Sequence, residues 1–114
     1  MVASGAGSQT LRGGGIRDAL HAGRRHAGSR VILYVRPRPE GLAAAFVAGR
    51  GVGGAVQRNR ARRVLREAWR SLAPRIDRGA DVVFVARRGI LQARSSDLEQ
   101  ELHALLERSG LMSR

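Results

Sequence analysis

The chain has 114 residues, no cysteine and a formal net charge of +12 at pH 7, because its 21 cationic residues, all arginine, outnumber 9 acidic ones. This length suits one domain with a modest core, and so high a charge indicates a polyanionic partner without specifying a fold. The composition excludes a disulfide framework and a thiolate metal site, and with no apolar run of membrane-spanning length and no signal-peptide core we expect a cytoplasmic protein without a membrane partner.

The N-terminal part of the chain predicts a flexible tail, a short helix and a basic loop. Residues 1–10 are small and polar and are expected to form the tail, whereas residues 11–114 are expected to form a single domain. A helix that ends at Gly23 is predicted by apolar residues spaced i, i+3 and i+4, namely Ile16, Ala19 and Leu20. The cations of the basic loop are Arg24, Arg25 and Arg30.

Two strands are predicted next. Residues 31–35 read Val-Ile-Leu-Tyr-Val, a β-branched and aromatic run, and the Arg-Pro-Arg-Pro sequence at 36–39 stops the strand. Pro-Glu-Gly-Leu at 39–42 predicts a turn. Residues 43–48, although rich in alanine, can then return as an antiparallel partner of the first strand.

Residues 49–54 read Gly-Arg-Gly-Val-Gly-Gly, which matches the G-x-G-x-x-G fingerprint of dinucleotide-binding folds. We reject this interpretation, because such a fold needs more βα units than a chain of this length contains. A glycine-rich approach to a helix can equally offer backbone N–H groups to an RNA phosphate.

Residues 52–72 are the most informative segment, because a helical projection separates them into an apolar and a cationic face. The apolar face consists of Ala61, Val64, Leu65, Ala68, Trp69 and Leu72, and the cationic face of Arg58, Arg60, Arg62, Arg63, Arg66 and Arg70. A face that serves only solubility is the alternative, but such faces mix both signs of charge, and here Glu67 alone interrupts six arginines. Like charges three and four apart destabilise a helix, so we interpret this face as a binding surface for nucleic acid.

The C-terminal part predicts one more strand and one more helix. Pro74 and Gly79 mark the end of the basic helix, and residues 80–86 form an apolar run of buried-strand length. Residues 96–99 read as a capping box, and a leucine stripe that ends at Gly110 predicts the last helix, with Leu98, Leu102, Leu105 and Leu106. Residues 95–114 hold few arginines, so we expect the last helix to serve packing. The predicted order, helix-strand-strand-helix-strand-helix, is that of an α+β sandwich.

The sequence offers no catalytic or metal-binding constellation. It contains no Ser-His-Asp set, no paired carboxylates on one face and no activated nucleophile. The histidines, His21, His26 and His103, are too scattered to indicate metal ligands. We therefore assign no catalytic residue and no metal-binding residue.

Residues 53–67 read Gly-Gly-Ala-Val-Gln-Arg-Asn-Arg-Ala-Arg-Arg-Val-Leu-Arg-Glu, an Arg-Asn-Arg core followed by paired basic residues, an aliphatic residue and Leu-Arg. This stretch resembles the signature of the bacterial ribonuclease P protein subunit. The similarity extends more weakly from about Leu11 to the C-terminus, because the predicted helices and strands stand in the family's order.

The resemblance implies the protein subunit of a ribonucleoprotein endonuclease that removes 5′ leaders from precursor tRNA, with the RNA subunit performing the chemistry. The protein alone would be inactive and would bind no cofactor, while divalent metal ions, expected to be Mg²⁺, would be held by RNA and substrate. The family's fold implies a two-layer α/β sandwich with a small mixed sheet and a left-handed crossover through the basic helix.

The family's binding residues carry over by position to two sets. The set for the RNA subunit is Arg50, Arg58, Asn59, Arg60, Arg62, Arg63 and Arg66, and the set for the leader is Arg12, Ile16, Leu20 and Tyr34. The chain departs from the family at Ile16 and Leu20, where the family usually has aromatic residues four apart. Residues 11–114 are accordingly expected to form a single RNA-binding domain that contacts the RNA subunit and precursor tRNA.

Two other classes of function fit the charge. A generic RNA-binding or ribosome-associated protein would share the basic helix but not the ordered motif. A protein nuclease active by itself would cleave precursor tRNA without any RNA subunit.

Overall fold

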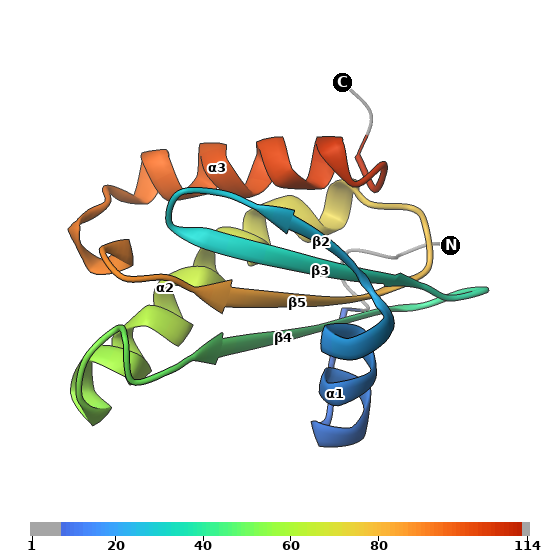
Figure 1. The fold of residues 1–114 in the computed structure, drawn as a ribbon. Helices are drawn as coiled ribbons and strands as arrows, with labels where there is room; N and C mark the ends of the chain where they lie inside the picture. The colour runs from blue at the N-terminus through green and yellow to red at the C-terminus, as the bar shows by residue number, and fades with distance from the viewer. Residues whose placement is uncertain (1–7, 113–114) are drawn as a thin grey trace.

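The computed structural model describes residues 8–112, which form five strands and three α-helices (Figure 1). In chain order these are β1 (Gln9–Thr10), α1 (Gly13–Ala22), β2 (Arg24–Ala27), β3 (Val31–Pro37), β4 (Leu42–Ala48), α2 (Ala55–Leu72), β5 (Ala80–Ala86) and α3 (Ser95–Arg108). Two single-turn 3-10 helices, η1 (Ala73–Arg75) and η2 (Ile90–Gln92), flank β5. The content confirms the predicted α+β class and the predicted order of the three helices.

The five strands form one mixed sheet in the order β1-β4-β5-β3-β2. Strand β5 runs antiparallel to β3 and parallel to β4, so that Val83 lies opposite Tyr34 on one side and Ala45 on the other. The prediction that residues 43–48 pair with residues 31–35 is therefore wrong, because β5 lies between them. Strands β3 and β4 do run in opposite directions, but they are separated by β5 and form no hydrogen bonds with each other.

The parallel neighbours β4 and β5 are joined by a crossover through α2. In Figure 1 both strands point to the left, β5 lies above β4, and α2 passes behind the sheet. A chain that leaves β4, passes behind the sheet and returns at β5 in this arrangement turns in the left-handed sense, against the usual preference. The structure thus contains the left-handed crossover that the family resemblance implies.

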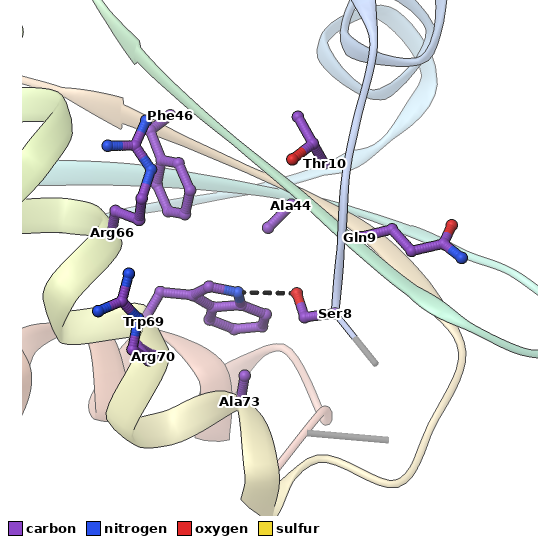
Figure 2. A pocket seen from close by; sticks show the side chains of 9 residues that line it. All are labelled: Ser8, Gln9, Thr10, Ala44, Phe46, Arg66, Trp69, Arg70 and Ala73. Atoms are coloured by element: carbon purple, nitrogen blue, oxygen red, sulfur yellow. Dashed lines mark hydrogen bonds between the residues drawn. The ribbon is translucent and has the colours of Figure 1, made fainter. Parts of the chain in front are cut away.

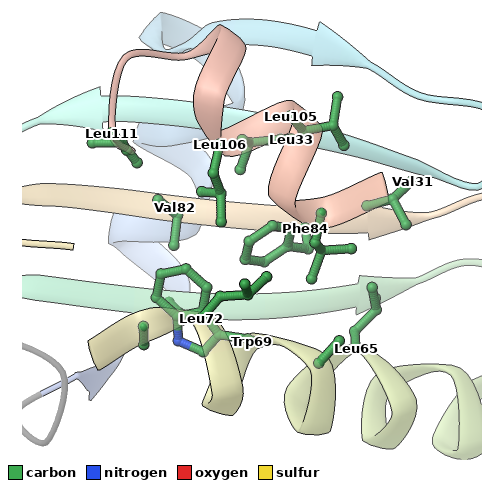
Figure 3. Close-up of a cluster of buried hydrophobic side chains, with 14 of the residues drawn as sticks. Val31, Leu33, Leu65, Trp69, Leu72, Val82, Phe84, Leu105, Leu106 and Leu111 are labelled. Atoms are coloured by element: carbon green, nitrogen blue, oxygen red, sulfur yellow. The ribbon is translucent and has the colours of Figure 1, made fainter. Parts of the chain in front are cut away.

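The main core lies between one face of the sheet and the helices α2 and α3 (Figure 3). Alternate residues of the central strands point into it, and among them Leu33, Val82 and Phe84 are fully buried. The helices add the apolar stripes that the sequence predicts, with Leu65, Trp69 and Leu72 from α2 and Leu98, Leu102, Leu105 and Leu106 from α3. Helix α3 therefore serves packing, as expected.

Helix α1 packs on the opposite face of the sheet from α2 and α3 (Figure 1). Ala19 is fully buried there against Ala45 and Val83, and the half-buried Ile16 and Tyr34 pack around them. The two-layer sandwich is thus extended by a partial third layer that consists of one short helix.

Strands β1 and β2 are absent from the sequence predictions. Residues 24–27, predicted as basic loop, form the edge strand β2, while Arg30 does lie in the turn that follows. The sequence Arg-Arg-His-Ala has no apolar alternation, because an edge strand with exposed side chains does not need one. The prediction of a flexible tail is wrong for Gln9 and Thr10, which pair with β4, and residues 1–7 of that segment lie outside the described residues.

Helix α3 ends as predicted but begins differently. Gly110 has a φ of +85° and closes the helix in a Schellman motif, a conformation that favours glycine. The capping box predicted at residues 96–99 is wrong, because the helix already begins at Ser95. Glu99 instead accepts a hydrogen bond of 2.7 Å from the Ser71 hydroxyl of α2, which links the two helices.

Candidate nucleic-acid interface

The arginines of α2 lie on its solvent side, opposite the side chains that the helix buries. Arg60, Arg63, Arg66 and Arg70 are exposed and Arg58 and Arg62 are half-buried, whereas Ala61, Leu65, Ala68, Trp69 and Leu72 are buried. Within residues 8–112 no acidic side chain forms an ion pair with any of these six arginines. A surface with this much uncompensated positive charge attracts polyanions.

Three of these arginines are held in place by neighbouring groups. Arg58 donates a hydrogen bond of 3.0 Å to a backbone carbonyl of the preceding loop, and Arg62 donates to the side-chain oxygen of Asn59. The guanidinium of Arg66 lies over the ring of Phe46 on β4, 5.4 Å from its centroid, in a cation–π contact. Such contacts restrict the side-chain rotamers in advance, so less conformational entropy is lost when a ligand binds.

The arginines of α2 also enclose a shallow, open hollow of about 460 Å³. It is lined by Val56, Asn59, Arg60, Arg62, Arg63 and Arg66. Val56 is 77% exposed, so the hollow offers an apolar contact together with guanidinium and amide donors. This composition suits the backbone of a nucleic acid, whose phosphates accept hydrogen bonds from arginine.

The glycine-rich loop before α2 places Arg50 at an exposed turn, outside this hollow. The N–H groups of Val52 and Gly53 donate to the carbonyls of Gly49 and Arg50, at 3.1 Å each, so these two amides are not available to a phosphate. Gly53 has a φ of +147°, and a Cβ there would lie 2.8 Å from that of Gln57. The apparent dinucleotide fingerprint is therefore a tight turn that leads into α2.

The four residues predicted to contact the leader lie on or beside α1. The structure brings Ile16 and Tyr34 together in the small cluster under this helix, where both are half-buried. Leu20 is 37% exposed and Arg12 is the exposed residue that precedes the helix, so neither belongs to that cluster. Beyond α1 the sheet face continues with half-buried valines of β4 and β5, which leaves a partly open apolar surface.

Phe46, beside the arginine face, is absent from the site predicted from the sequence, and Arg70, although it belongs to that face, is not among the residues that the resemblance assigns to the RNA subunit. The ring of Phe46 contacts the guanidinium of Arg66. The alternation of side chains along β4 is the signal that could have placed Phe46 under α2. Arg70 lies one turn after Arg66, and both arginines line a second hollow near Phe46.

The described residues contain no cluster of three His, Asp or Glu side chains that could hold a metal ion. Burial, together with the nearby cations Arg108 and Arg24, lowers the pKa of His26 below its ordinary value, which favours the neutral imidazole. Within residues 8–112, no helix is long and apolar enough to cross a membrane.

A small mixed-sheet domain with an uncompensated arginine face on its crossover helix is typical of a nucleic-acid-binding protein. Similarity to known proteins identifies the family within this class. The family model for ribonuclease P matches residues 12–110. The ribonuclease P protein component of Chloroflexus aurantiacus is 45% identical over 98 residues, covering 84% of this chain and 73% of that protein. The component of Symbiobacterium thermophilum is 40% identical over 94 residues, covering 81% of this chain and 82% of that protein.

Solved structures share the fold. The RNase P protein of Staphylococcus aureus superposes with a TM-score of 0.79 at 16% identity, covering 92% of this chain and 97% of that one. The RNase P protein of Thermotoga maritima gives a TM-score of 0.74 at 22% identity, covering 88% and 96%. The chain belongs to the ribonuclease P protein family. The function of this family is the maturation of tRNA 5′ ends by an endoribonuclease that acts as a ribonucleoprotein.

Proposed function

We propose that this chain binds the RNA subunit of ribonuclease P through the arginine face of α2 and assists recognition of the 5′ leader of precursor tRNA. The observation that carries the proposal is the two-sided helix, whose apolar side is buried while its six arginines have no acidic partner in the described part of the chain. Phosphate contacts then supply most of the affinity. The residues assigned to them are Arg50, Arg58, Asn59, Arg60, Arg62, Arg63 and Arg66.

The leader is assigned to the sheet face that α1 partly covers. Ile16 and Tyr34 offer half-buried apolar contacts to unpaired bases, and the exposed Leu20 and Arg12 lie on the same helix or next to it. Helices α1 and α2 lie on opposite faces of the sheet, so the two surfaces do not compete for one ligand. This arrangement supports simultaneous contact with the RNA subunit and with precursor tRNA.

In this proposal the protein supplies binding and positioning, and the RNA subunit supplies the chemistry. No residue is given a catalytic or metal-binding role, and the Mg²⁺ ions of hydrolysis are assigned to RNA and substrate. The protein alone binds no cofactor. We place this activity in the cytoplasm.

The test is cleavage of precursor tRNA by the protein, by the RNA subunit and by both together. We expect the protein alone to be inactive and the combination to cleave faster than the RNA subunit alone. Cleavage by the protein alone would identify a protein nuclease. A chain that binds many RNAs equally and does not stimulate the RNA subunit would be a generic RNA-binding protein.

Binding to the RNA subunit is expected to weaken steeply with salt, because phosphate contacts release counterions. Each alanine substitution among Arg58, Arg62 and Arg66 should flatten the slope of log affinity against log salt by about one unit. Arg78→Ala is the matched control, since Arg78 is exposed but lies outside α2. Lower affinity with an unchanged slope would argue against phosphate contacts by the substituted arginine.

The variant Ile16→Phe is expected to bind precursor tRNA more tightly in the assembled holoenzyme and to leave binding of mature tRNA unchanged. An aromatic ring stacks on an unpaired base with roughly 1–3 kcal/mol per base, whereas isoleucine offers only apolar contact. Affinities for both tRNAs and the melting temperature are measured on the same variant. Ala104→Phe, which adds a ring on the exposed side of α3, should change neither affinity.

The competing interpretation of Ile16 is that it only fills the space under α1. The larger ring would then overpack the cluster and destabilise the fold by about 1–3 kcal/mol. A lower melting temperature without any gain for precursor tRNA would therefore contradict the assignment of this face to the leader.

A further inference from the structure

A second hollow, of about 350 Å³, lies between the C-terminal half of α2 and strand β1 (Figure 2). We refer to it as the Phe46 pocket, since Phe46 forms part of its wall. Its lining combines two guanidinium groups, two aromatic rings and the polar side chains of residues 8–10. Its volume falls at the lower end of the range found for pockets that hold small ligands.

The α2 side of the Phe46 pocket is a layered stack. The ring of Phe46 lies parallel to that of Phe84 in the core, with centroids 5.9 Å apart and an interplanar angle of 7°. The guanidinium of Arg66 lies over the Phe46 ring and also lines the pocket. A guanidinium is planar and weakly hydrated, so it can stack on a further planar group such as a nucleobase.

The opposite side of the pocket is formed by β1 and offers hydrogen-bonding groups. The register pairs Thr10 with Ala44, so both side chains point to the face that α2 covers. The hydroxyl of Ser8 accepts a hydrogen bond of 3.1 Å from Trp69 Nε1, which leaves its own proton available for donation. Figure 2 shows Ser8 and Thr10 across the pocket from Arg66 and Arg70, with the short side chain of Ala44 between them.

The Phe46 pocket is continuous with the arginine face, because Arg66 lines both this pocket and the hollow around Val56. A nucleic-acid strand whose phosphates lie along α2 can therefore place its next nucleotide in the pocket. Arg70, one turn further along the helix, is positioned at the pocket for the phosphate of that nucleotide.

We propose that the Phe46 pocket holds one unpaired base of an RNA strand bound along α2. The base stacks on the guanidinium of Arg66, and its edge forms hydrogen bonds with the hydroxyls of Ser8 and Thr10. A paired, stacked helix presents no free base, so the pocket selects an unpaired nucleotide and sets the register of the RNA on the protein. This inference rests on the proposed function, since it requires RNA on the arginine face.

The first test uses Trp69, the only tryptophan of the chain, as a reporter in the pocket wall. The full chain is titrated at constant ionic strength with a single-stranded RNA trinucleotide, with an abasic ribose-phosphate oligomer of equal charge and with inorganic phosphate. We expect a saturable change of Trp69 fluorescence with the trinucleotide only. An equal change with the abasic oligomer or with phosphate would show an anion site, and no change at all would exclude the base; either result overturns the inference.

The second test separates stacking from charge. Arg66→Lys keeps the positive charge but removes the planar guanidinium, and it should weaken binding of the trinucleotide by about tenfold. Thr10→Val keeps the shape of an exposed side chain but removes its hydroxyl, and it should also weaken binding. Arg78→Lys, which lies outside both α2 and the pocket, is the matched control and should retain full affinity. An equal loss for Arg78→Lys would contradict the inference.

The failure of this inference can be told from the failure of the proposed function. The salt dependence of binding to the RNA subunit is measured for the same three variants and should be unchanged, because each keeps the net charge of the chain. Steep salt dependence together with an unresponsive Trp69 would overturn the base pocket alone. Weak, salt-independent binding to the RNA subunit would overturn the proposed function itself.

Discussion

Replacing Trp69 with alanine is expected to lower the free energy of unfolding by about 3–5 kcal/mol, the usual cost of removing a large aromatic side chain from a core. Trp69 is only 4% exposed, and the centroid of its ring lies 5.3 Å from the centroid of the Phe84 ring. The burial confirms the core position that the apolar face of α2 predicts. A loss of this size is a large part of the stability of a small domain, so the variant is expected to unfold at a much lower denaturant concentration.

The measurement is denaturant-induced unfolding followed by far-ultraviolet circular dichroism, which does not depend on tryptophan. Ser8→Ala is the companion variant, because it removes the partner of Trp69 Nε1 and leaves the ring in place. It should cost only about 0.5–1.5 kcal/mol, the net contribution of one hydrogen bond. A folded Trp69→Ala protein that has lost RNA binding would show that the ring contacts RNA rather than the core.

The parts of the fold that could be predicted are those in which the side-chain pattern alone decides the structure. Residues 80–86 and the apolar face of α2 follow from apolar runs and helical spacing, and the structure reproduces both. Strand order cannot be obtained in this way, because residues 31–35 carry the same apolar signal whichever strand lies beside them. The insertion of β5 between β3 and β4 depends on the crossover through α2, a long-range feature that no local pattern specifies.

The residues of the candidate site fall into the same two groups, those that a local side-chain pattern predicts and those that only tertiary packing brings together. The arginine face of α2 follows from a single helix and could be predicted in full. The Phe46 pocket could not, because its walls come from β1, β4 and α2, and a two-residue strand such as Gln9–Thr10 carries no periodic signal. The contact of Arg66 with Phe46 likewise joins residues that only tertiary packing brings together.

A single carboxylate, that of Glu101, joins helix α3 to the turn between β2 and β3. Its Oε2 accepts hydrogen bonds from the backbone N–H groups of Arg30 and Val31, at 2.8 and 3.0 Å. Its Oε1 accepts from the Ser29 hydroxyl at 3.2 Å and from the Arg30 guanidinium at 3.3 Å. Gly28 permits this approach, since a Cβ there would collide with the carboxylate. The side chain of Glu101 is only 11% exposed, so water cannot easily replace it.

Glu101→Ala is therefore expected to lower the free energy of unfolding by about 2–4 kcal/mol, because it leaves two poorly solvated backbone donors without an acceptor. Glu99→Ala is the matched control on the same helix: Glu99 is exposed and accepts one hydrogen bond from Ser71, so its loss should cost less than about 1 kcal/mol. Denaturant unfolding gives both values, and amide hydrogen exchange at Arg30 and Val31 should accelerate in the Glu101 variant alone. Equal stability losses for the two variants, with exchange at the turn unchanged, would show that the carboxylate does not hold the turn against α3.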